Sequence, residues 1–169
     1  MLIVNISNAT GFTPSEAAKL QDAVEVIQAV VNGEAFKQEV LAFKFQNKGG
    51  LTNQEIYDLF MSGSEVLQPQ EDQEMDVNIN MYYSNNNVIG YTYANTIKTW
   101  INRKYYSRLA PDGIAANITH EYMHKLGFGH DYYATKIRPY SVPYAIGNMV
   151  QRIDPDDAHV KAILTGGFW

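Results

Sequence analysis

The chain has 169 residues, of which 46% are hydrophobic and 18% are charged, so it can bury a core and is expected to form a single domain, residues 1–169. It contains no cysteine, which excludes a disulfide scaffold, a thiolate zinc site and a cysteine nucleophile. The net charge of −5 argues against a nucleic-acid partner, and no apolar run is long enough for a membrane span.

The first half of the chain predicts two strands and two helices. Alternating apolar residues predict strands over residues 2–6 and 40–45. Two capping-box patterns, Thr13 with Glu16 and Thr52 with Glu55, predict helices over residues 14–31 and 53–61. The first of these helices has apolar residues at helical spacing, so one face of it is expected to pack on a core.

The second half predicts three more strands and two more helices. The strands are expected over residues 76–83, 88–94 and 97–106, and the first alternates most clearly. A helix of about a dozen residues follows Pro111. The chain after Gly127 is expected to be loop-rich, and a last helix is expected from Pro155, with Asp154 as its cap.

Three of the four histidines lie in one short stretch. His120 and His124 are four residues apart, so on a helix they lie on one face, where two imidazoles can bind one cation. Gly127 tolerates the left-handed conformation that ends helices, which lets the chain turn back and bring His130 to the same ion. Glu121 lies about 100° round the helix from His120, beside the metal without needing to ligate it.

This arrangement predicts a catalytic zinc site. Three neutral histidines suit zinc at about 2.0–2.1 Å and leave a fourth position open for water. Zinc lowers the pKa of bound water towards about 7, and Glu121 is expected to act as general base and then as general acid in amide hydrolysis. Chance alone places these five residues in register with a probability on the order of 10⁻⁴ or less. The alternative is that the histidines are ordinary surface or core residues.

The residues His120, Glu121, His124, Gly127 and His130 form the pattern HExxHxxGxxH, and the chain resembles the metzincin clan of zinc metallopeptidases. The match is strongest over residues 118–131, and no family within the clan is assigned. The resemblance implies a small α+β catalytic domain with a mixed twisted sheet, a backing helix and an active-site helix. Residues 1–127 would form the N-terminal subdomain, and residues 128–169 a small irregular C-terminal subdomain that ends in a helix.

The resemblance also implies further site residues. Met149 is the candidate for a methionine in a tight turn that packs under the metal without binding it. The segment expected to pair with an extended substrate as an edge strand consists of Gly90, Tyr91, Thr92, Tyr93 and Ala94. Several metzincin families have a tyrosine two residues after the methionine, but Gln151 occupies that position here. Tyr140 and Tyr144 are candidates to replace it or to form the pocket wall.

The expected function is a monomeric zinc endopeptidase (a hydrolase) that acts on a protein or peptide substrate. Two alternatives stay open: a catalytically silent zinc-binding recognition module, and a zinc hydrolase of a non-peptide amide. The apolar run at residues 1–4 ends at Asn5 and is too short for the hydrophobic region of a signal peptide. The expected location is therefore the cytoplasm or export by a non-classical route, while the resemblance adds secretion.

Overall fold

The computed structural model describes residues 1–153 and residue 155, and it shows an α+β fold. In chain order, the elements are β1 (Ile3–Thr10), α1 (Pro14–Val31), α2 (Glu34–Ala42), α3 (Asn53–Ser62), β2 (Glu74–Tyr82), β3 (Gly90–Thr92), β4 (Thr99–Asn102), α4 (Arg103–Tyr106), α5 (Pro111–Lys125), the 3₁₀ turn η1 (Arg138–Tyr140) and α6 (Val142–Arg152). None of the helices in this described part is long and apolar enough to cross a membrane.

The four strands form one open mixed sheet in the order β1-β2-β4-β3. β1 and β4 pair with β2 in parallel, so β2 lies inside the sheet. β3 pairs with β4 in antiparallel register, with Tyr91 opposite Trp100. The expected edge strand at residues 90–94 is therefore confirmed for Gly90–Thr92, because β3 is the last strand on its side of the sheet.

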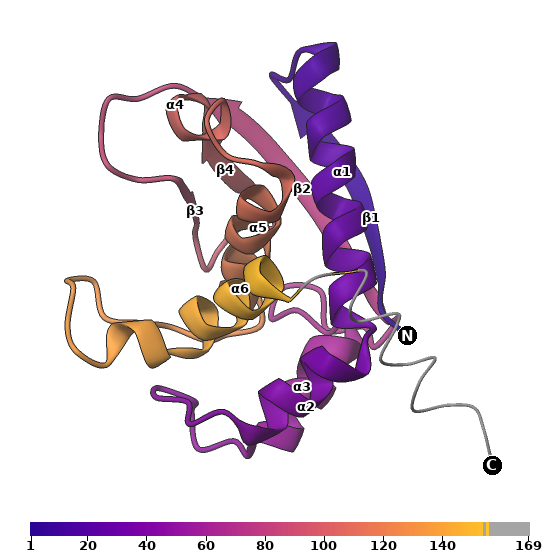
Figure 1. Ribbon diagram of the computed structural model, residues 1–169, viewed down its shortest axis with the longest axis vertical. Helices are drawn as coiled ribbons and strands as arrows, with labels where there is room; N and C mark the ends of the chain where they lie inside the picture. The colour runs from indigo at the N-terminus through magenta and orange to yellow at the C-terminus, as the bar shows by residue number, and fades with distance from the viewer. Residues whose placement is uncertain (154, 156–169) are drawn as a thin grey trace.

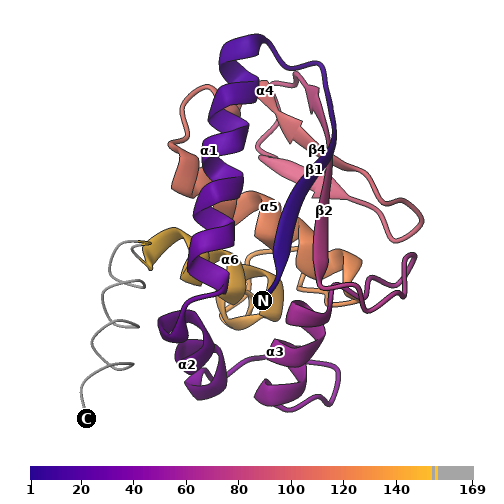
Figure 2. The ribbon, with the colours of Figure 1, turned by 90° about the vertical axis from the view of Figure 1, so that its right-hand side faces the viewer.

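Two long helices, α1 and α5, lie on the same side of the sheet (Figures 1 and 2). α1 packs on β1 and on α5, and α5 also contacts β3 and α6. The core lies between these layers, where apolar side chains of α1 meet those of β2 and α5. Fully buried examples are Leu20 and Ile27 of α1, Ile79 of β2, and Ile114 and Met123 of α5. α5 is thus held on several sides, which suits a helix that positions a site.

Both predicted capping boxes are confirmed. The Thr13 side chain accepts a hydrogen bond from the Glu16 amide at 3.3 Å, and the Glu16 carboxylate accepts one from the Thr13 amide at 2.8 Å. Thr52 and Glu55 make the same pair of bonds at 3.2 and 2.7 Å. Each box satisfies backbone donors that a helix start leaves unpaired, which explains why α1 and α3 begin where the local sequence predicts.

The strand predicted over residues 40–45 is wrong, because α2 occupies residues 34–42. Phe36 and Val40 are four residues apart and both buried, whereas Leu41 of the expected strand face is 37% exposed. The side-chain amide of Asn53 donates hydrogen bonds to the carbonyls of Val40 and Leu41, each at 3.0 Å. Helical burial together with this partner from α3 outweighs the short alternation of apolar residues.

The strands predicted over residues 88–94 and 97–106 are both too long. β3 covers only Gly90–Thr92, and β4 ends at Asn102. Asn102 is fully buried and its side-chain oxygen accepts a hydrogen bond from the Lys104 amide at 3.1 Å, so it caps the helical turn α4. An asparagine favours helix starts, and this signal was available in the sequence.

The segment after Gly127, predicted to be loop-rich, contains the helix α6. Pro143 and Gly147 read as helix breakers, but Pro143 lies in the first turn, where a proline needs no amide partner. At Gly147 an added Cβ would lie 2.8 Å from the carbonyl oxygen of Ala116, so glycine lets α6 approach α5 closely. The last helix predicted from Pro155 to about residue 164 lies outside the described residues, apart from Pro155 itself.

Candidate metal centre

α5 supplies two of the three histidines, and the turn after it brings in the third. His120 and His124 lie one helical turn apart on α5. Gly127 adopts φ +96° after the helix, as predicted. Its amide donates to the His124 carbonyl at 3.0 Å, and the Phe128 amide donates to the Met123 carbonyl at 3.1 Å. These two bonds form a Schellman motif, which reverses the chain and places His130 opposite the helix.

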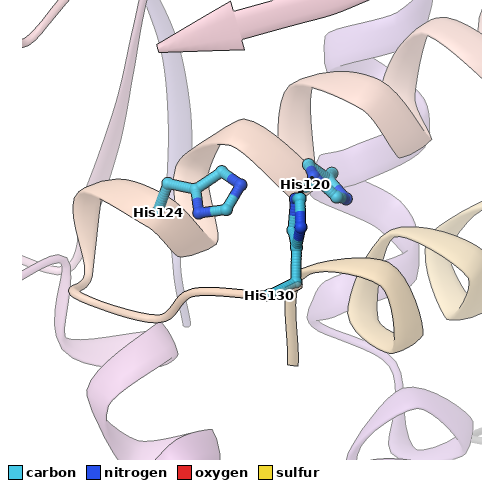
Figure 3. A group of neighbouring side chains, drawn as sticks. All are labelled: His120, His124 and His130. Atoms are coloured by element: carbon cyan, nitrogen blue, oxygen red, sulfur yellow. Dashed lines mark hydrogen bonds between the residues drawn. The ribbon is translucent and has the colours of Figure 1, made fainter. Parts of the chain in front are cut away.

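The three imidazoles converge on one point (Figure 3). The Nε2 atoms of His120 and His130 are 3.2 Å apart. One ligating nitrogen from each of the three residues lies within 4.8 Å of the others. The predicted ligand set is therefore brought together, and it could hold a metal ion.

The outer nitrogens of His124 and His130 are directed to backbone carbonyls. Nδ1 of His124 lies 2.8 Å from the Phe128 oxygen, and Nδ1 of His130 lies 2.9 Å from the Asp131 oxygen. His120 has a backbone partner at Pro143, at the start of α6. A carbonyl can only accept, so Nδ1 of His124 and of His130 carries the proton, and the neutral form of each ring turns an Nε2 lone pair inwards. Facing lone pairs repel, and a cation between them removes the repulsion.

Burial favours the neutral form of His120 and His124. Desolvation lowers the pKa of His120 to about 3, and the neighbouring His124 and His130 act in the same direction. Desolvation also lowers the pKa of His124, opposed by its bond to the Phe128 carbonyl. Neutral imidazole is the form that binds metals, so His120 and His124 can bind near pH 7 without losing a proton.

Glu121 is buried beside the triad, with 4% of its surface exposed. Burial raises its pKa to about 8, while Lys125 and the backbone amide of Thr92 oppose the shift because both favour the carboxylate. A divalent cation at the histidines would oppose the upward shift of the Glu121 pKa in the same way, since an opposite charge also favours the carboxylate. The group is thus suited to accept and return a proton near neutral pH.

A cleft of about 1010 Å³ runs between β3 and α5 and contains the triad and Glu121. All five residues of the predicted substrate strand line it, namely Gly90, Tyr91, Thr92, Tyr93 and Ala94. At Gly90 an added Cβ would lie 2.4 Å from Oδ1 of Asn117 on α5. Glycine therefore lets the edge strand approach α5, the helix that carries His120 and His124, closely.

The two candidate tyrosines lie in different places. The Tyr144 ring centroid is 4.5 Å from that of His120 and 4.8 Å from that of His130, and Tyr144 lines the cleft. Tyr140 is 51% exposed and stacks on Phe43 at 6.3 Å, so the structure does not bring it to the cleft. Of the two candidates, Tyr144 on α6 is therefore the one that packs against the candidate ligand rings of His120 and His130.

The tight turn predicted at Met149 is wrong. Met149 lies in the second half of α6 and is fully buried. The α6 residues that line the cleft are Tyr144, Gly147, Asn148 and Gln151. One face of α6 therefore borders the cleft. Met149 is a buried core residue of the same helix.

Three charged residues of the cleft were missed by the sequence interpretation. Arg138 lies with its guanidinium carbon 4.8 Å from the centroid of Tyr144. Lys125 and Glu65 are only 9% and 4% exposed, and both line the cleft. Lys125 follows Glu121 by four residues, a spacing that places both on one helix face and could have indicated it. Glu65 lies in the connection between α3 and β2, and Arg138 lies in the short 3₁₀ turn η1, so no local pattern places them here.

Comparisons of this chain with models of protein families, with curated proteins and with solved structures found no match.

Proposed function

We propose that the chain is a zinc-dependent endopeptidase in which Glu121 acts as general base and general acid. One observation carries this proposal: one ring nitrogen from each of three histidines lies close to the others beside a buried glutamate, within a cleft that a sheet edge borders. The HExxHxxGxxH pattern, which resembles that of metzincins, supports the same assignment.

Zinc fits this donor set. Tetrahedral coordination at about 2.0–2.1 Å separates two nitrogen ligands by about 3.3 Å, and Nε2 of His120 and His130 are 3.2 Å apart. His124 would complete a set of three nitrogen ligands, and backbone carbonyls orient the rings of His124 and His130. When bound, zinc supplies a Lewis acid that acidifies water and polarises a carbonyl.

Glu121 moves the protons of the reaction. It takes a proton from the attacking water and returns it to the nitrogen of the leaving amine. Burial on α5 holds the carboxylate in a dry environment and raises the pKa of Glu121. Tyr144 packs edge-on against His120 with an interplanar angle of 80°, and so limits the rotation of that ring.

β3 is the proposed binding strand for the substrate. It pairs with β4 on one side only, and its residues Tyr91 and Thr92 line the cleft. An extended peptide can add to such an edge through main-chain hydrogen bonds, which recognise peptides independently of their side chains. This arrangement favours a peptide over a non-peptide amide as the substrate.

The test compares the zinc-loaded chain with Glu121→Gln on casein and on a quenched-fluorescence peptide library. We expect zinc content to be unchanged and cleavage to fall by about 10²- to 10⁴-fold, the usual contribution of a positioned acid-base group. Glu71→Gln is the matched control, because Glu71 is an exposed glutamate away from the cleft lining, and it should cleave like wild type.

The alternatives predict other results. Stoichiometric zinc without cleavage of any peptide would identify a recognition module, and cleavage of non-peptide amides alone would identify a different hydrolase. Activity of Glu121→Gln near the wild-type level would refute the assigned base.

A further inference from the structure

A cationic side chain lies on the cleft wall next to the histidines. The Arg138 guanidinium carbon is 4.8 Å from the ring centroid of Tyr144, and that ring is in turn 4.5 Å from His120. Arg138, Tyr144 and His120 all line the cleft. A positive charge therefore lies close to the proposed reaction centre, with only the Tyr144 ring between Arg138 and His120.

The backbone that carries Arg138 is held firmly. Its carbonyl accepts hydrogen bonds from the amide and the hydroxyl of Ser141, at 3.1 and 2.7 Å. Ser141 is fully buried, and the neighbouring Tyr140 carbonyl accepts from the Gln46 amide at 2.8 Å. These bonds tie η1 to α6 and to the chain after α2. The backbone position from which the guanidinium extends is thus fixed by the fold.

The head group of Arg138 lacks a partner among residues 1–153 and 155. Its Nε is buried and makes no hydrogen bond there. Two other arginines in this part of the chain do form ion pairs: Arg103 pairs with Glu16, and Arg152 pairs with Glu39. Asp131, in the same loop as Arg138, instead accepts a hydrogen bond from Thr135. A buried unpaired donor is rare in proteins and calls for a ligand that completes it.

We propose that Arg138 binds a carboxylate of the substrate, so that the chain prefers peptides with a negative charge close to the scissile bond. This inference rests on the proposed function and names its substrate class. A guanidinium presents several donors in a fixed fork that matches a carboxylate, and contact with an aromatic ring through its face does not use these donors. The carboxylate can be an acidic side chain or the free C-terminus of a peptide.

The experiment measures binding to the zinc-loaded Glu121→Gln variant, which needs no cleavage. Short fluorescent alanine-based peptides with a blocked C-terminus carry one Glu at successive positions, and each has a twin with Gln. A further pair differs only in a free or amidated C-terminus. We expect roughly ten- to hundredfold tighter binding of the charged twin in one position, which is the usual range for a charge-assisted hydrogen bond. The position identifies the source of the carboxylate.

Arg138→Gln, added to this variant, should abolish the preference, so that the charged and neutral twins bind with equal affinity. Lys136→Gln is the matched control, since Lys136 is an exposed cation in the same loop. Arg138→Lys, which keeps the charge but not the fork, should retain a reduced preference and serves if Arg138→Gln does not fold. Zinc content and thermal unfolding report on folding.

Equal affinity for every charged and neutral pair would overturn the assignment, as would a full preference that survives Arg138→Gln. Failure of the proposed function has a different signature. In that case the wild-type chain cleaves no peptide, whereas the Glu121→Gln variant still distinguishes the charged twin from the neutral one.

Discussion

Gly90→Ala tests whether stability and activity require the close packing of the edge strand β3 against α5, the helix that carries His120 and His124. The new Cβ would lie 2.4 Å from Oδ1 of Asn117 and 3.0 Å from the carbonyl oxygen of Trp100. Ordinary contacts begin near 3.4 Å, so β3 and α5 must separate by up to about 1 Å unless the Asn117 side chain rotates away. Overpacking usually costs about 1–3 kcal/mol, and the rotatable amide places this case at about 1–2 kcal/mol.

For a chain of this size, that cost lowers the melting temperature by about 2–8 °C. A displacement near 1 Å at the substrate strand should also reduce kcat/KM by up to about 10²-fold, with zinc content unchanged. Calorimetry and cleavage of a quenched-fluorescence peptide measure the two effects. Gly129→Ala is the control, since Gly129 also lines the cleft but an added Cβ there meets nothing within 4 Å.

Asn117→Ala should rescue the variant, because it removes the atom in closest contact. Oδ1 of Asn117 has no hydrogen-bond partner within the described residues, so its loss alone should cost little. The double variant should recover most of the lost stability, with a coupling energy of about 1 kcal/mol. If Gly90→Ala is as stable and as active as wild type, or if Asn117→Ala fails to rescue it, the proposed contact between strand and helix is refuted.

Two further changes test the scaffold. Arg103 lowers the pKa of Glu16, so Glu16→Gln should destabilise the chain by about 0.5–1 kcal/mol at neutral pH. A lowered folded-state pKa gives stability that is present above the usual value of 4.5 and is lost as pH falls through the folded value. Urea unfolding of both proteins from pH 7 to pH 3 should show the gap closing, and a gap independent of pH would contradict this cause. The Tyr122 hydroxyl is buried without a partner in the described part of the chain, so Tyr122→Phe should be neutral or stabilise by about 1 kcal/mol; a clear loss of stability would show that the hydroxyl is satisfied.

Local signals explain which parts of the fold the sequence predicts. A capping box needs only four adjacent residues, so Thr13 with Glu16 and Thr52 with Glu55 indicate their helix starts correctly. The spacing of the histidines and Gly127 likewise depends on one helix and its end. These features are decided within a few residues, and the structure reproduces them.

Long-range contacts explain the errors. The sequence did not predict α6 because proline and glycine usually break helices. In the structure Pro143 lies in the first turn of α6, and Gly147 packs closely on the backbone of Ala116. The same helix supplies the Pro143 backbone partner of His120, so the orientation of that ring could not be predicted. Arg138 approaches Tyr144 through a loop whose path depends on its bond to Gln46.

The most direct test of the central claim is the zinc content of the purified chain after loading and dialysis, measured by mass spectrometry. We predict one zinc ion per wild-type chain, the same content in Glu121→Gln, and a clear loss in His130→Ala, which removes one of three ligands. A wild-type chain without stoichiometric zinc, or a His130→Ala chain that holds as much zinc as wild type, would contradict a centre built from the three imidazoles.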